Sequence, residues 1–231
     1  MFLFILLFAG TMAISLLATL RVKSAYAKYS QHPTASGYTG AEAAEQILQA
    51  VGVYDVQVVE LDELLGDHYD PLNKRLVLSG GNFHSRSTAA LGIAAHECGH
   101  AIQHKVGYAP LQWRMAAVGL TSFASQAVLW LPLVGMFTGI LSGRTGLMIM
   151  AIAWGVIMLF NLITLPVEYD ASHRAKEVLG AMGFIREGEE SIAVNKVLDA
   201  AAWTYVAAFV TSLAYFLWHL LPLLLNSRRS E

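Results

Sequence analysis

The sequence predicts a mainly α membrane protein, with about four transmembrane helices and a small α+β region outside the bilayer. The first observation behind this fold class is the composition, since hydrophobic residues make up 55% of the chain and charged residues only 14%. Average soluble proteins are about 25% charged, so this chain has too little polar surface for a water-soluble globule. The second observation is that the apolar residues gather in long uncharged stretches, and about 20 such residues span a bilayer core.

The charge balance and the cysteine content exclude further classes of protein. A formal net charge of −2 provides no basic surface, so the sequence predicts no nucleic-acid partner. Cys98 is the single cysteine, which rules out an intrachain disulfide framework. The lipid bilayer is therefore the partner that the composition indicates.

Four uncharged stretches are long enough to cross a membrane. They run from Phe2 to Leu20, from Met115 to Gly143, from Thr145 to Val167 and from Ala200 to Ser227. The first could instead be a cleavable signal peptide, but its basic residues follow the apolar run, so we interpret it as a retained anchor. The second contains Pro132, which would make it either one kinked span or a re-entrant pair.

The distribution of positive charge predicts the orientation in the membrane. With four spans, residues 21–114 and 168–199 share one side, which holds 12 Lys and Arg residues against 3 on the other. The positive-inside rule makes the richer side cytoplasmic. The expected parts are an N-terminal anchor (1–20), a membrane-surface α+β region (21–114), two transmembrane helices (115–167), a helical segment (168–199) and a C-terminal transmembrane helix with its tail (200–231).

The first polar region contains signals for both helices and strands. Thr39-Gly40-Ala41-Glu42 is typical of a capping box, and the helix that it starts is expected to stop at Gly52. Residues 56–61 and 75–79 are predicted as strands, with a turn at residues 70–73 between them. A further helix is expected from about Ser87 to residue 103 or 104. Its apolar part is too short to span a membrane, so we expect a buried core helix.

A motif for metal chemistry, His96-Glu97-Cys98-Gly99-His100, lies in that last helix. Histidines at positions i and i+4 share one helix face, so both imidazoles can bind one metal ion. Zinc would lower the pKa of a bound water from about 16 to about 7, and Glu97 would take its proton during attack on a peptide carbonyl. Alternatively, the two histidines and Glu97 could simply lie on the solvent-exposed face of an amphipathic helix. However, the motif directly follows seven small or apolar residues, where isolated ionisable groups are costly to bury.

A catalytic zinc site needs a third protein ligand. Glu168 is the best candidate, because it directly follows the third span and faces the same side of the membrane as the two histidines. His104 lies four residues further along the same helix. Because this helix is expected to run as far as residue 103 or 104, we interpret His104 as a helix-end residue and not as a ligand. Asp170 and His173 are rival ligands close to Glu168.

Several segments together, in this order, resemble a known family. They are Lys28-Tyr29-Ser30, Thr34-Ala35-Ser36-Gly37, Thr39-Gly40-Ala41-Glu42, Asp67-His68-Tyr69-Asp70-Pro71, Ala94-Ala95-His96-Glu97, Gly99-His100-Ala101-Ile102-Gln103-His104, Leu165-Pro166-Val167-Glu168 and Ala201-Ala202-Trp203-Thr204-Tyr205-Val206-Ala207-Ala208. The chain resembles, over nearly its whole length, the YugP-type neutral zinc metallopeptidases of bacterial membranes. That family is itself similar to membrane gluzincins such as the CAAX prenyl proteases.

The resemblance implies a gluzincin-like α+β region that binds one zinc ion per chain. It implies His96, His100 and Glu168 as the ligands and Glu97 as the catalytic base. Gluzincins often carry an Asp four residues after the ligand Glu, where it orients a histidine, but here that position is Ser172. Whether Ser172 or Asp170 supports a ligand is therefore open.

Other roles around the predicted site stay open at this point. The group that polarises the scissile carbonyl could be His68, Tyr69, His173 or Arg174. The strand at residues 75–79 could accept a peptide substrate by edge pairing. Cys98 should point away from the ligand face, and we expect it to be a packing residue.

The sequence thus predicts a membrane-bound zinc metalloendopeptidase that acts at the cytoplasmic membrane surface on membrane-associated protein or peptide substrates. One alternative is an intramembrane zinc protease, for which Asp199 would supply the third ligand. The other is a non-catalytic zinc-binding scaffold or carrier. A carrier would need ionisable groups inside its spans, and His219 is the single one there.

Overall fold

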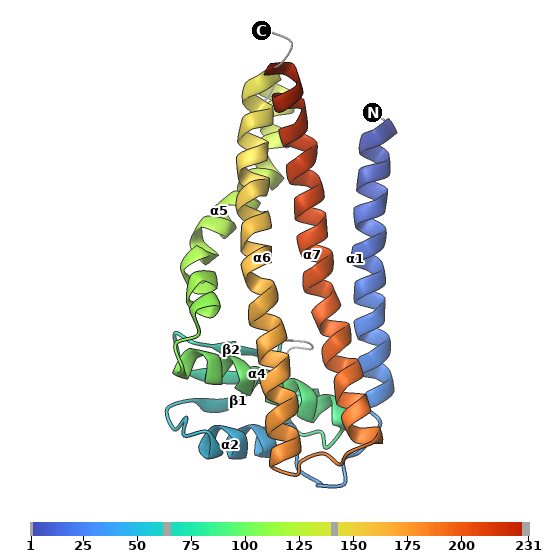
Figure 1. The fold of residues 1–231 in the computed structure, drawn as a ribbon, viewed down its shortest axis with the longest axis vertical. Helices are drawn as coiled ribbons and strands as arrows, with labels where there is room; N and C mark the ends of the chain where they lie inside the picture. The colour runs from blue at the N-terminus through green and yellow to red at the C-terminus, as the bar shows by residue number, and fades with distance from the viewer. Residues whose placement is uncertain (1, 62–65, 140–142, 228–231) are drawn as a thin grey trace. The chain divides into compact units, whose positions relative to one another are not determined.

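The computed structural model describes residues 2–61, 66–139 and 143–227, and these are dominated by helices (Figure 1). The helices are α1 (Phe2–Tyr29), α2 (Gly40–Ala50), α3 (Gly80–Phe83), α4 (Thr88–Lys105), α5 (Ala109–Thr138), α6 (Gly143–Ala181) and α7 (Glu189–Ser227), and the strands are β1 (Gln57–Leu61), β2 (His68–Asp70) and β3 (Arg75–Ser79). Within these described residues, four helices, α1, α5, α6 and α7, are long and apolar enough to cross a membrane. The predicted fold class, a mainly α membrane protein with a small α+β part, is confirmed.

The long helices extend beyond the uncharged stretches that predicted them. The stretch at residues 115–143 forms one helix, α5, as far as Thr138 with Pro132 inside it, and residues 140–142 lie outside the described part of the chain. Helix α6 continues through Pro166 to Ala181, so the third predicted span and the ligand candidate Glu168 belong to one helix.

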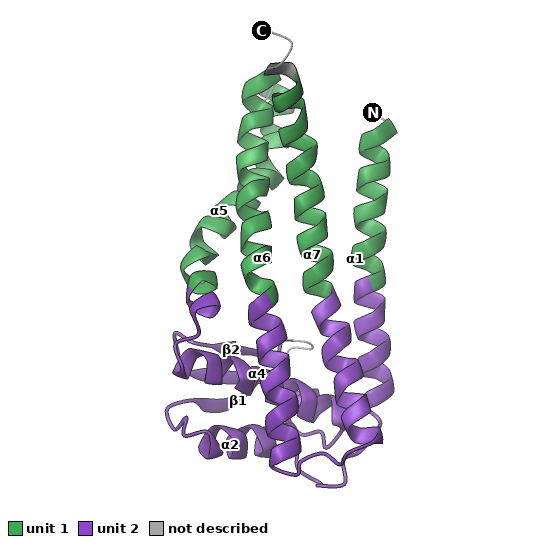
Figure 2. Ribbon diagram, viewed as in Figure 1, with its two compact units in different colours: residues 1–17, 113–165, 204–231 green, residues 18–112, 166–203 purple. Residues whose placement is uncertain are grey.

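The chain forms two compact units (Figure 2). Unit 1 comprises residues 1–17, 113–165 and 204–231, and unit 2 comprises residues 18–112 and 166–203. The boundary falls inside α1, α5, α6 and α7, so each of these helices contributes residues to both units. Each unit therefore combines segments that are far apart in the sequence.

Unit 1 holds most of the uncharged length of the four long helices, and a few polar groups pack within it. The Thr11 hydroxyl lies 3.4 Å from the hydroxyl of Tyr215, whose ring stacks on Trp154 with centroids 4.6 Å apart. The Asn161 amide donates to the Ala208 carbonyl at 3.2 Å and to the Ser212 hydroxyl at 3.0 Å. Hydrogen bonds of this kind satisfy polar groups where no water is available.

The three-stranded sheet of unit 2 has the order β1-β3-β2 in the described part of the chain. β1 pairs in parallel with β3, from Gln57 opposite Arg75 to Leu61 opposite Ser79. β2 pairs antiparallel with the other side of β3, from His68 opposite Val77 to Asp70 opposite Arg75. The expectation that β3 is an edge strand open to a peptide is therefore wrong, because residues 75–77 are paired on both sides. β2 was not predicted.

The core of unit 2 forms around α2 and α4. The predicted capping box begins α2, where the Glu42 carboxylate accepts from the Thr39 amide at 2.8 Å and the Glu42 amide donates to the Thr39 hydroxyl at 3.2 Å. The Ser87 hydroxyl caps α4 in the same manner by accepting from the Ala90 amide. Small residues line α4, and Leu91 is fully buried in the core cluster. The prediction of a buried core helix is confirmed.

Candidate metal centre

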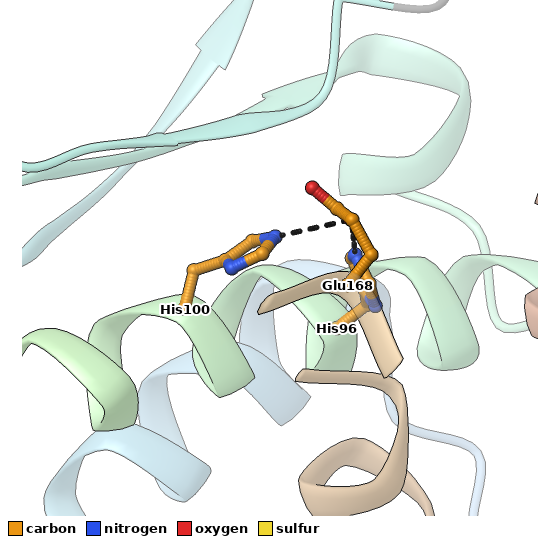
Figure 3. Close-up of side chains that lie close together, drawn as sticks. All are labelled: His96, His100 and Glu168. Carbon is orange, nitrogen blue, oxygen red and sulfur yellow. Dashed lines mark hydrogen bonds and ion pairs between the residues drawn. The ribbon is translucent and has the colours of Figure 1, made fainter. Parts of the chain in front are cut away.

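Three predicted ligands meet inside unit 2 (Figure 3). His96 and His100 lie one turn apart on α4, and Glu168 approaches them from α6. The Glu168 Oε2 atom lies 3.2 Å from His96 Nε2 and 3.6 Å from His100 Nε2. One nitrogen or oxygen atom from each residue falls within 4.8 Å of the other two. Two imidazole nitrogens and one carboxylate oxygen at such spacing suit a catalytic zinc ion, which takes three protein ligands and keeps one position open.

Gly99 explains how α6 comes close enough to α4 to deliver Glu168. A Cβ atom at Gly99 would lie 2.5 Å from the Ala171 carbonyl oxygen and 3.0 Å from the Ala171 Cα atom. Real Cβ atoms essentially never approach backbone this closely, so any larger residue would force the two helices apart. The glycine inside the metal-binding motif therefore has a packing function.

Glu168, His100 and the neighbouring Glu97 are largely shielded from solvent. Glu168 is 1% exposed, and His100 and the predicted base Glu97 are each 8% exposed. Burial lowers the pKa of His100. Its hydrogen bond to Glu168 and the charges of Glu97 and Glu168 together raise the pKa by more than burial lowers it, so the pKa lies above its ordinary value. The local potential is thus negative, which favours a cation at this position.

Each histidine is also held through its other ring nitrogen. The Ser172 hydroxyl lies 3.1 Å from His96 Nδ1, and the Gln103 side-chain oxygen lies 3.0 Å from His100 Nδ1. Of the two residues that the sequence left open, Ser172 thus contacts a ligand directly, whereas Asp170 contacts Gln103. The sequence reasoning missed Gln103. The available signal was its position three residues after His100, on the same helix face.

The candidates for carbonyl polarisation have other contacts. The His68 ring donates through Nδ1 to the Gly66 carbonyl oxygen at 2.7 Å. The exposed His173 pairs with Glu177 at 3.2 Å. Arg174 donates to Asp170 at 2.6 Å. These contacts hold the side chains in place but assign none of them to the reaction.

Tyr69 and His104 form a pair at the C-terminal end of α4. The Tyr69 hydroxyl lies 2.9 Å from His104 Nδ1. Burial, followed by the charges of Asp55 and Asp70, raises the pKa of Tyr69 to about 12. His104 does not belong to the three-residue cluster among the described residues, which agrees with its interpretation as a helix-end residue.

The residues on which the two alternative functions depend, Asp199 and His219, and the cysteine lie elsewhere in the described structure. Asp199, the third ligand of the alternative reading, is 58% exposed at its side chain and pairs with Lys176 at 2.9 Å. His219 Nδ1 lies 2.7 Å from the carbonyl oxygen of Tyr215 in its own helix. Cys98 is completely buried in the core cluster, as expected of a packing residue, and burial raises the pKa of its thiol well above the ordinary value.

Comparison with known proteins then places the chain. The model of a family described as "Putative neutral zinc metallopeptidase" matches residues 4–224. The chain belongs to this family. A relative of this chain, "Putative membrane protease YugP" of Bacillus subtilis (strain 168), is 44% identical over 226 residues, which cover 98% of each chain. No solved structure matches the chain, so the gluzincin-like character of its α+β part stays a prediction.

Proposed function

We propose that this member of the family is a membrane-bound zinc metalloendopeptidase. It would bind one zinc ion through His96, His100 and Glu168 and use Glu97 as the general base. The observation that carries the proposal is the convergence of three ligand atoms within 4.8 Å of one another, in a chain of a zinc metallopeptidase family.

The position of Glu97 in the motif supports a role in proton transfer. A zinc ion held by the three ligands would act as a Lewis acid toward a water molecule and the peptide carbonyl. Glu97 follows the first ligand directly and is 8% exposed. As a carboxylate, Glu97 can accept the proton that the water loses while the oxygen of that water bonds to the carbonyl carbon. It can then donate that proton to the amine as the carbon–nitrogen bond breaks.

The position of Glu168 in α6 supports membrane-associated substrates. Glu168 directly follows the uncharged residues 145–167, within the same helix. Substrates would therefore be loops or tails presented near the bilayer. The excess of Lys and Arg in residues 21–114 and 168–199 supports a cytoplasmic location for the site.

The variant Glu97→Gln tests the mechanism in the full-length protein, purified in detergent without chelators. Zinc per chain is measured by elemental analysis, and cleavage is measured with a fluorescently labelled unfolded protein. We expect about one zinc in both proteins, and a cleavage rate reduced about 10²- to 10⁴-fold in the variant, since that is the contribution of a general base.

The variant Glu45→Gln is the matched control, because Glu45 lies exposed on α2 in the same unit. It should retain both zinc and cleavage. Cleavage by Glu97→Gln at the wild-type rate would show that Glu97 is not the base. A wild-type protein without zinc would contradict the metal centre itself.

A further inference from the structure

Gln103 is a fully buried polar side chain that contacts both ligand-bearing helices. Its exposure is 0%. Its side-chain oxygen lies 3.0 Å from His100 Nδ1 on α4. Its side-chain nitrogen donates to the Val167 carbonyl at 2.7 Å and to the Asp170 carboxylate at 2.8 Å, both on α6. All three contacts lie within unit 2.

The two contacts on α6 determine which way the amide faces. A backbone carbonyl and a carboxylate can only accept hydrogen bonds, so both must face the NH₂ group of Gln103. Asp170 is kept as a carboxylate partner by Arg174, which donates to it at 2.6 Å. The amide oxygen is therefore left to face His100.

This orientation selects one tautomer of His100. Because the Gln103 oxygen can only accept, His100 Nδ1 must carry the hydrogen. The lone pair then lies on Nε2, the atom that faces Glu168 Oε2 at 3.6 Å. Metal-binding histidines usually donate their second ring N–H to an oxygen acceptor, which fixes the ring and raises its affinity for the ion.

We infer that Gln103 is a positioning residue for the metal centre, with Asp170 and Arg174 holding its amide in place. It sets the tautomer and ring orientation of His100. Through the Val167 carbonyl it also ties this ligand to the turn of α6 that carries Glu168. The inference rests on the proposed function, because the positioned ligands are those of the proposed zinc site.

Replacement of Gln103 by Glu separates positioning from space filling. Glu is almost the same size and can still accept from His100. However, it places a carboxylate oxygen against the Val167 carbonyl and the Asp170 carboxylate, where the native amide donates. Gln103→Met fills the same space without any of the three hydrogen bonds. Gln46→Glu is the matched control, because Gln46 is exposed on α2 in the same unit.

The experiment measures three properties of the full-length protein in detergent. These are the zinc dissociation constant, the visible absorption spectrum after loading with Co²⁺, and the melting temperature of the metal-free protein. For Gln103→Glu and Gln103→Met we expect zinc affinity about 10- to 100-fold weaker than wild type. We also expect a Co²⁺ spectrum with altered bands, because the geometry of one ligand changes. Gln46→Glu should match wild type in all three properties.

The outcomes separate this inference from the proposed function. Wild-type zinc affinity and an unchanged Co²⁺ spectrum in both Gln103 variants would overturn the positioning role while leaving the zinc site intact. A lower melting temperature with an unchanged Co²⁺ spectrum would also overturn it, since that is the signature of packing alone. A wild-type protein that binds neither metal would overturn both the proposed function and the inference.

Discussion

The two units follow opposite rules of burial, although the same four helices run through both. In unit 1 many large apolar side chains are exposed, such as Phe123 at 74% and Ile152 at 65%. In unit 2 apolar residues such as Leu91 and Leu179 are completely buried in one cluster. Exposed apolar surface on this scale is typical of a protein surface that contacts lipid, whereas a closed apolar core is typical of a part that faces water. The comparison indicates that the composition of each long helix changes along its length, as expected of a helix that passes from lipid into water.

The candidate metal centre lies entirely in the unit with the closed core. His96, His100 and Glu168 are partly or fully buried there, and hydrogen bonds with Ser172 and Gln103 hold the two rings. Buried ionisable groups need such partners, because their desolvation is otherwise too costly. Unit 1 supplies apolar surface, and unit 2 supplies a buried polar site. Matched substitutions in the two units test this division.

The largest effect is expected from Glu168→Ala, which removes a ligand from unit 2. Two histidines alone leave a zinc site one protein ligand short, so zinc affinity should fall by at least about 100-fold, and cleavage should be lost. Asp199→Ala is the control, since that exposed side chain pairs with Lys176. Zinc content in detergent measures both. Retention of zinc by Glu168→Ala and its loss from Asp199→Ala would reassign the third ligand and favour an intramembrane protease.

The opposite rules of burial predict unequal costs for truncated apolar side chains. Leu91→Ala opens a cavity in the core of unit 2 and should reduce the free energy of unfolding by about 2–5 kcal/mol. Phe123→Ala in unit 1 should change it by less than about 0.5 kcal/mol, because that ring is 74% exposed. Chemical denaturation in detergent compares the two. Equal costs would mean that unit 1 packs as tightly as unit 2.

The glycines of the two units offer a narrower comparison. In Gly99→Ala the new methyl group would lie 2.5 Å from the Ala171 carbonyl oxygen. This overpacking should cost about 1–3 kcal/mol and weaken zinc binding, because it displaces α6. Gly119→Ala in unit 1 meets nothing within 4 Å and should be neutral or slightly stabilising. Unchanged zinc affinity in Gly99→Ala would show that Glu168 does not depend on this close approach.

The smallest effect is expected from Ser172→Ala, which removes the hydroxyl next to His96 Nδ1. The ring keeps its place on α4, so we expect zinc affinity to fall only about tenfold, the lower end of the usual range for such partners. Ser212→Ala removes a buried hydroxyl from unit 1 and should leave zinc affinity unchanged. A titration with a competing chelator measures both. An equal loss in the two variants would point to general destabilisation.

The features that the sequence predicted well depend on local patterns. Uncharged stretches identified the long helices, a four-residue box placed the start of α2, and the spacing of His96 and His100 placed both on one helix face. Glu168 could be found because it directly follows an apolar stretch and because the resemblance implied it. In these cases the physical signal lies within a few residues of the feature.

The features that the sequence reasoning missed depend on contacts between distant segments. β2 is only three residues long and has no alternation of apolar residues, so only its pairing with β3 makes it a strand. Gln103 looks like an ordinary polar helix residue until Val167 and Asp170 are brought against it. The role of Gly99 likewise depends on the backbone at Ala171. Tertiary packing decides such features, and neither propensity nor periodicity encodes it.

The burial of Cys98 has a practical consequence for mapping this protein in its membrane. The thiol is 0% exposed and packs against the Ala44 carbonyl at 3.7 Å, so a water-soluble maleimide cannot reach it in the folded chain. The unaltered chain should therefore give no signal in a thiol-labelling experiment. Labelling of a cysteine introduced at another position would show on which side of the membrane that position lies. The motif around Cys98 would not need to be changed.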